Sequence, residues 1–232
     1  MRSVQISVRS LVEFLLREGD IDNRRAHDAV NAMQEGGRLH RKIQKAQGSD
    51  YHAEVPLSYV WISGIMSTDI PDLTYSDDDL TDYLTDIPDD EVVIIIDGRA
   101  DGIIDERRAP DGGIITPVTI DEIKGTYRRL DKMDGPENVH LAQAKCYACI
   151  YAIQNGLDVI AVRMTYINMD NEDIRYFDSE YTTEELREWF FALLKDYEKW
   201  VRLELDWKDV RDGSIKKVGF PYEYRKGQKE LK

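Results

Sequence analysis

The run Val92–Ile96 is the feature that most restricts how this chain can fold. It consists only of valine and isoleucine, and an unbroken apolar run of β-branched residues is typical of a strand buried on both faces of a sheet. Such a strand needs covering elements on each side. The run therefore predicts a sheet that is flanked by helices.

Patterns elsewhere in the chain predict the other strands and helices. Alternating or apolar β-rich segments predict strands over 54–62, 114–124 and 159–167, with 174–177 pairing with the last of these. Capping patterns and apolar spacing predict helices from Ser10 to about Gly19, over 139–154, and from Thr182 through Trp207. The order of these elements predicts a mixed α/β sheet.

Glycines mark the expected breaks between these elements. Gly36-Gly37 predicts an interruption in a helix that resumes with Leu39, and Asp97-Gly98 predicts a turn or bulge followed by a hairpin. Asp111-Gly112-Gly113 predicts a turn, and Asn155-Gly156 predicts the end of a helix. Asp212-Gly213-Ser214 is typical of a linker.

The composition is that of a soluble globular protein. Of the 232 residues, 42% are apolar and 33% are charged, and no apolar run approaches the length that spans a bilayer. No signal-peptide pattern is present, so a cytoplasmic protein without a membrane partner is expected. The net charge of −14 is concentrated in 66–91, which holds nine Asp and one Glu and no basic residue. This segment is either a solvated loop or a guard that repels unsuitable duplex.

Three residues around the second and third predicted strands suggest chemistry. Asp101 follows the buried strand, and Glu122 and Lys124 lie two apart on the next one, so their side chains share a face. Carboxylates bind hard cations such as Mg²⁺ or Mn²⁺, and a lysine beside them can orient or deprotonate a water. The alternative for Glu122 and Lys124 is an exposed ion pair, and Asp101 alone could be a turn residue.

Gln143 and Tyr147 lie four apart on a predicted helix and therefore share a face. Without a functional role, the tyrosine would simply pack half-buried. His40 is either an ordinary surface histidine or a metal ligand. Arg99 and Arg128 are possible phosphate contacts on spacing alone.

Four motifs occur in order: Gly-Gly-Arg-Leu-His40, Gly-Arg-Ala-Asp101-Gly, Glu122-Ile-Lys124 and Gln143-Ala-Lys-Cys-Tyr147. This set resembles the RecB-like branch of the PD-(D/E)xK nucleases, over roughly 38–167. The resemblance implies a restriction-endonuclease-like core of α-β-β-β-α-β order with helical additions.

The resemblance also implies roles for individual residues. His40, Asp101, Glu122 and the carbonyl of Ile123 would ligate Mg²⁺ or Mn²⁺, and Lys124 would position the attacking water. Gln143 and Tyr147 would hold Lys124 and the substrate strand. Some members of this branch carry an iron–sulfur cluster on four cysteines. This chain has only Cys146 and Cys149, which are expected to be core thiols without a cluster.

The tail Gly219–Leu231 resembles the opening of the motor in XPD-like/DinG-type helicases, or it is an ordinary polar terminus. On the first reading, 1–211 is a nuclease domain with 66–91 as an insertion, and 212–232 is a linker and the start of a motor. No nucleotide is expected in this fragment. The expected function is hydrolysis of DNA in repair or end processing. A non-catalytic DNA-binding or docking module and an RNA nuclease are the alternatives.

Overall fold

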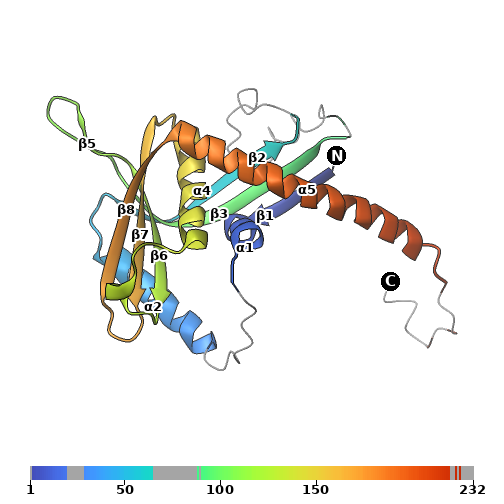
Figure 1. The fold of residues 1–232 in the computed structure, drawn as a ribbon, viewed down its shortest axis with the longest axis horizontal. Coiled ribbons are helices and arrows are strands. Elements are labelled where there is room, and N and C mark those ends of the chain that lie inside the picture. Colours follow the sequence, from blue (N-terminus) through green and yellow to red (C-terminus); the bar gives the residue numbers. More distant parts are fainter. Residues whose placement is uncertain are drawn as a thin grey trace.

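The apolar run Val92–Ile96 forms the first half of β3 (Val92–Ile104), the longest strand among the described residues. A computed structural model of the chain describes residues 2–19, 29–64, 88, 90–219, 223 and 225. Val92, Val93, Ile94 and Ile96 are fully buried, so β3 is covered on both faces as the sequence predicts. The described residues form a mixed α/β fold (Figure 1).

One six-stranded sheet contains β3. β2 pairs with β3 in antiparallel fashion along almost all of one edge, while the other edge is shared by β1 and β6. β7 then pairs in parallel with β6, and β8 pairs in antiparallel fashion with β7. The other strands of this sheet are β1 (Arg2–Ser7), β2 (Tyr51–Ile62), β6 (Thr119–Thr126), β7 (Val159–Asn168) and β8 (Ile174–Thr182). A separate hairpin is formed by β4 (Arg107–Arg108) and β5 (Ile114–Thr116).

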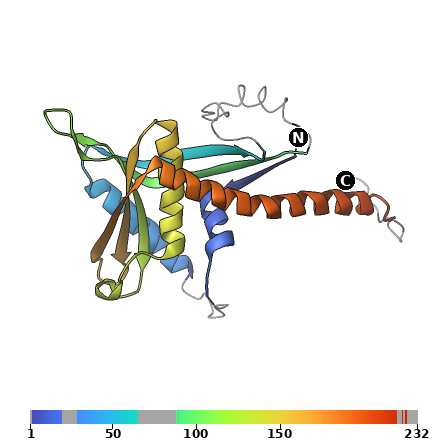
Figure 2. The same cartoon turned by 45° about the horizontal axis from the view of Figure 1, so that its top comes forward.

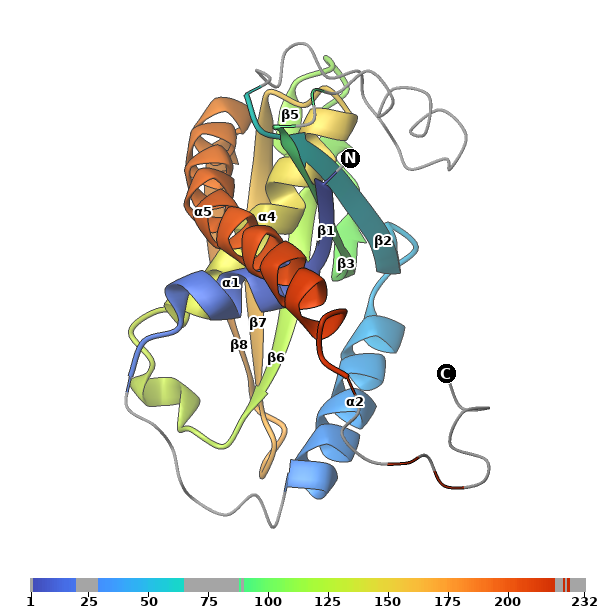
Figure 3. The same cartoon turned by 90° about the vertical axis from the view of Figure 1, so that its right-hand side faces the viewer.

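Helices pack on both faces of the sheet, as Figures 2 and 3 show. On one face, α1, α4 and α5 join the main core, in which the α4 residues Ala144, Ala148 and Ile150 are fully buried. On the other face, α2 packs Leu39 and Ile43 against Ile123 and Ile167. The helices are α1 (Val8–Leu16), α2 (Ala29–Ala46), α4 (Asn138–Gln154), α5 (Thr183–Ile215) and the 3₁₀ turn η1 (Leu130–Lys132).

Several local predictions are confirmed. Thr182 caps α5, and Glu185 returns the bond to the Thr182 backbone, which completes the capping box. Gly156 has φ +60° where α4 ends. The segment from Ile174 pairs with β7 as predicted. Cys146 and Cys149 are buried core thiols.

The N-terminal prediction is wrong in two respects. The described part of the chain begins with β1, which the sequence patterns did not predict, and α1 starts at Val8 with Ser7 as its cap. The backbone N–H of Ser10 donates to the Ser7 side chain, so Ser10 lies inside the first turn. β1 is short, and its strand character comes from pairing in parallel with 92–97, which lie far away in the chain.

Three glycine-based breaks are also absent from the described structure. α2 runs through Gly36-Gly37 without interruption, and its Leu39 and Ile43 pack on the sheet while Arg38 pairs with Glu35 and Glu172. β3 likewise continues through Asp97-Gly98 instead of turning there. Helix α5 extends past Trp207 to Ile215, so Asp212-Gly213-Ser214 are helical and not a linker.

The third predicted strand, 114–124, is in fact two strands. β5 belongs to the small hairpin and β6 to the main sheet. Pro117 lies between them and has no N–H to donate to a ladder. Most of the acidic segment 66–91 and nearly all of the tail 220–232 lie outside the described residues. In the part that the structure describes, no helix is long and apolar enough to cross a membrane.

Candidate active site

The candidate site lies where β1 and β6 part along one edge of β3. The ladder with β1 ends at Asp97, and the ladder with β6 begins at Gly102. Over Gly98–Asp101, side chains take the place of a neighbouring strand. The Tyr147 hydroxyl accepts from the Arg99 N–H at 3.3 Å, and the Asp101 carboxylate accepts from the Ile123 N–H at 2.8 Å.

The two glycines of the Gly-Arg-Ala-Asp-Gly motif make room for aromatic rings. A Cβ on Gly98 would lie 2.6 Å from the Tyr147 hydroxyl oxygen, and one on Gly102 would overlap the Tyr51 ring. Both tyrosines take part in the hydrogen bonding of the site. The motif therefore packs closely against its neighbours, which explains why a Gly-containing segment can continue as a strand.

Glu122 and Lys124 form the centre of the site, and they share a face as predicted. Lys124 Nζ lies 2.7 Å from Glu122 Oε1 and donates to Gln143 Oε1 at 3.0 Å. The pair is not an exposed ion pair, because the Glu122 side chain is only 1% exposed. Glu122 Oε2 is buried and finds no hydrogen-bond partner among the described residues.

Burial controls the electrostatics of these carboxyl groups. Burial raises the pKa of Glu122 to about 8, against the opposing effect of Lys124, and Asp101 raises it further. Burial also raises the pKa of Asp101, while His40, the Ile123 N–H and Lys124 lower it. Two carboxyl groups thus sit in surroundings that disfavour a second negative charge, a setting in which a bound cation is stabilising.

His40 reaches this centre from α2. Its Nδ1 lies 3.7 Å from Asp101 Oδ1, a distance too long for a hydrogen bond. One turn further along α2, Gln44 donates to the Asp101 carbonyl at 2.9 Å and to Glu54 Oε1 at 2.9 Å. Glu54 lies on β2 with φ +58°, a conformation that residues other than glycine seldom adopt.

The α4 face carries Gln143 and Tyr147, as the four-residue spacing predicts. Both are buried, and Gln143 binds Lys124 directly. Burial is the main cause that raises the pKa of Tyr147, and Glu122 adds to it. Tyr147 is therefore a neutral hydroxyl at ordinary pH, and it accepts the N–H of Arg99.

The two arginines singled out by spacing form ion pairs with other residues. Arg99 Nη1 lies 3.6 Å from Glu54 Oε2, and Arg128 Nη1 lies 2.8 Å from Glu137 Oε1. The two arginine side chains are 64% and 63% exposed. Exposed ion pairs of this kind contribute little to stability, and phosphate contact by either arginine stays a prediction.

The sequence patterns did not predict a buried hydrogen-bonded cluster around Asp121, which lies beneath the site. Asp121 accepts from the hydroxyls of Tyr51, at 3.0 Å, and Thr165. Burial raises the pKa of Asp121 to about 6, although both hydroxyls lower it. The side chain alternates to the opposite face from Glu122. A lone Asp before Glu122 gives no signal for these partners, which come from β2 and β7.

His140 and Arg9 were also missed. Tyr166 lies beside Lys124 in the β6–β7 register, and its hydroxyl is 3.0 Å from His140 Nδ1. The same hydroxyl oxygen also accepts the Glu137 N–H, so Tyr166 contacts both the N-cap and the first turn of α4. Burial lowers the pKa of His140, and Lys124 lowers it further.

Arg9 forms an ion pair with Glu13. The hydrogen bond to Glu13 is the main cause that raises the pKa of Arg9, and the charge of Glu122 raises it as well.

The arrangement does not contain a formed set of metal ligands. Within the described residues, no group of three or more His, Cys, Asp or Glu side chains is placed to hold a metal ion. Glu122 Oε1 is turned toward Lys124, and Asp101 Oδ2 is turned toward the Ile123 N–H. The metal-ligand roles of His40, Asp101, Glu122 and Ile123 therefore stay predictions.

Comparison with known proteins yields little. No family model matches the chain, and no curated protein matches it. A similar solved structure is the crystal structure of SSO0001, with 18% sequence identity and a TM-score of 0.39. The match covers 82% of this chain and 75% of that chain. A likeness this weak carries no argument about function.

Proposed function

We propose that this chain is a metal-dependent nuclease that hydrolyses phosphodiester bonds in DNA. The observation that carries the proposal is the buried Glu122 carboxylate, whose Oε2 finds no partner in the described structure although Lys124 is bound to its other oxygen. An unsatisfied buried carboxylate oxygen is costly unless a ligand uses it. The neighbouring Asp101 and His40 supply further oxygen and nitrogen donors.

This donor set fits Mg²⁺ or Mn²⁺. Two carboxylates and an imidazole suit these ions better than a soft metal, and the Ile123 carbonyl is available on the same strand. His40, Asp101 and Glu122 would hold the ion. When bound, it would neutralise charge on the phosphate and make a bound water more acidic.

The chain's own residues would organise the rest of the reaction. Lys124, which is held by Glu122 and Gln143, would position the attacking water with its ammonium group. His140 would donate a ring N–H to a phosphate oxygen. Arg99 and Arg128 at the exposed rim would contact neighbouring phosphates along the strand.

The order of elements supports the same proposal. The series α2, β2, β3, β6, α4 and β7 repeats the helix, three strands, helix and strand expected of the PD-(D/E)xK core. The four motifs meet at the gap between β1 and β6. We further propose that the domain serves a helicase motor in DNA repair or end processing. That part of the proposal rests on the tail sequence alone, which lies outside the described residues.

The test is a cleavage assay on end-labelled single-stranded DNA, double-stranded DNA and RNA, with Mg²⁺, Mn²⁺ or chelator. The wild-type chain should cut DNA only with metal, and Lys124→Ala should reduce the rate by at least about 100-fold. Lys195→Ala, which removes an exposed lysine on α5, serves as the matched control and should leave the rate unchanged. A Lys124→Ala protein that cut DNA at the wild-type rate would contradict the proposed role of Lys124.

A further inference from the structure

The second half of α5 presents an apolar stripe to solvent. Trp200, Leu203, Trp207 and Val210 are between 51% and 64% exposed, whereas Val201 on the opposite side of the helix is fully buried. Their spacing of three, four and three residues places them on one face of the helix, in the pattern of the inner positions of a coiled coil. Figures 1 and 2 show that α5 passes β1 and that its C-terminal end extends past the sheet.

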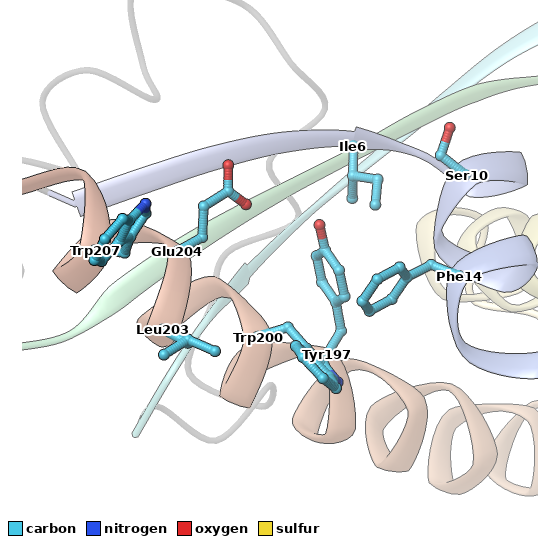
Figure 4. A pocket seen from close by; sticks show the side chains of 8 residues that line it. All are labelled: Ile6, Ser10, Phe14, Tyr197, Trp200, Leu203, Glu204 and Trp207. Carbon is cyan, nitrogen blue, oxygen red and sulfur yellow. The ribbon is translucent and has the colours of Figure 1, made fainter. Parts of the chain in front are cut away.

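The N-terminal end of the stripe packs against α1. The Phe14 ring contacts Trp200 edge-on at 5.5 Å and Tyr197 at 5.8 Å. Together with Ile6 of β1 they line an apolar groove beside α5 (Figure 4). A contiguous surface with two exposed tryptophans marks a site of association, because burying such rings removes a large apolar area from water.

The charges along the two flanks of the stripe indicate what covers it. Lys199 and Asp206 lie on one flank, and Glu204 and Arg211 lie on the other. If a second copy of α5 lies parallel and in register, Lys199 faces Glu204 of the second copy, and Asp206 faces Arg211 of the second copy. By symmetry each pair forms twice, and each of the four contacts joins residues of opposite charge.

An antiparallel pairing of the same stripes gives the opposite result. Stacking Trp200 on Val210 and Leu203 on Trp207 brings Glu204 opposite its own counterpart and Asp206 opposite its own counterpart. Like charges at flanking positions disfavour that arrangement. Within the chain, Lys199 pairs with Asp196 and Arg211 pairs with Asp212, and both of these exposed pairs are exchanged at little cost. Asp206, which is itself 68% exposed, pairs with the half-buried Arg2.

We infer that this chain forms a homodimer through a parallel pairing of α5, with Trp200, Leu203, Trp207 and Val210 at the seam. The seam is only two heptads long, but each helix is anchored in its own core through Leu194 and Val201. The pre-formed helix removes the ordering cost that makes short isolated helices unstable. This interface is independent of the proposed nuclease function.

The first test uses a single engineered cysteine. In the parallel arrangement Leu203 meets Leu203 of the second copy, so Leu203→Cys should form a disulfide-linked dimer under mild oxidation. The native Cys146 and Cys149 are buried and do not compete. Light scattering of the wild-type chain at tens of micromolar should give the mass of two chains. A monomeric wild-type mass, or a dimer in which Leu203→Cys does not cross-link, would overturn the parallel pairing.

The second test exchanges charges across the seam. Glu204→Lys should weaken the dimer about tenfold in sedimentation, because it places two lysines opposite each other. Adding Lys199→Glu should restore wild-type affinity, since the pair is then reversed. Lys195→Glu lies away from the seam and should have no effect. Equal affinities for Glu204→Lys and the double variant would contradict the register.

Discussion

Replacing Glu122 by glutamine should stabilise the protein at alkaline pH. The folded chain raises the pKa of this carboxyl from its ordinary value of 4.5 to about 8, chiefly through burial. A group whose folded pKa is raised binds more protons in the folded state than in the unfolded state. Its contribution to stability is therefore complete below pH 4.5 and is lost as the pH rises to about 8. A glutamine side chain would keep the shape of the glutamate and carry no charge to bury.

The size of the effect follows from the same interval. Each pKa unit corresponds to about 1.4 kcal/mol, so Glu122 costs the folded state at most about 5 kcal/mol above pH 8. Glutamine gives up the ion pair with Lys124, but that lysine is 20% exposed and keeps its bond to Gln143. For a chain of this length, a gain of about 3 to 5 kcal/mol raises Tm by about 10 °C.

Thermal unfolding followed by circular dichroism between pH 5 and pH 9, in the presence of chelator, measures this directly. The advantage of Glu122→Gln should be near zero at pH 5 and should grow through pH 8. Glu180→Gln, which changes an exposed carboxylate on β8, should shift stability by less than about 0.5 kcal/mol at every pH. A Glu122→Gln protein that was no more stable than wild type at pH 9 would refute the reasoning.

Three further changes test the packing around the site by denaturant unfolding. Gly98→Ala should cost about 1 to 3 kcal/mol, because the new methyl group displaces the buried Tyr147 ring; an unchanged midpoint would contradict that contact. Ile123→Ala should cost about 2 to 5 kcal/mol and increase hydrogen exchange in α2, which packs on that side chain. Asp121→Ala should cost about 1 to 3 kcal/mol for each of the two hydroxyls that it leaves without an acceptor. A loss smaller than for an exposed Asp→Ala would argue against this buried cluster.

Local patterns in the sequence were sufficient for the elements whose structure depends on near neighbours. The β-branched run at Val92–Ile96 predicts a strand buried on both faces, and β3 has that form. The Thr182 and Glu185 side chains cap α5 through residues three apart, so the start of that helix is readable without any tertiary contact. The two-residue alternation of a strand likewise places Glu122 and Lys124 on one face.

Tertiary contacts decided the features that local patterns failed to predict. α2 continues through Gly36-Gly37 and packs Leu39 and Ile43 on Ile123 and Ile167, which lie far along the chain. β1 is a strand because it pairs with 92–97. In each case the packing or pairing partner is distant in sequence, so local propensity alone predicted the wrong outcome.

The candidate site divides in the same way. Periodicity in the sequence is sufficient to place Glu122 and Lys124 on one face of a strand and Gln143 and Tyr147 on one face of a helix. Tertiary contacts bring Gln143 of α4 to Lys124, bring Tyr51 and Thr165 to the neighbouring Asp121, and leave Gly98–Asp101 without a strand partner on one edge of β3. Periodicity specifies the direction of a side chain, whereas burial, charge and pKa depend on what the rest of the chain places over it.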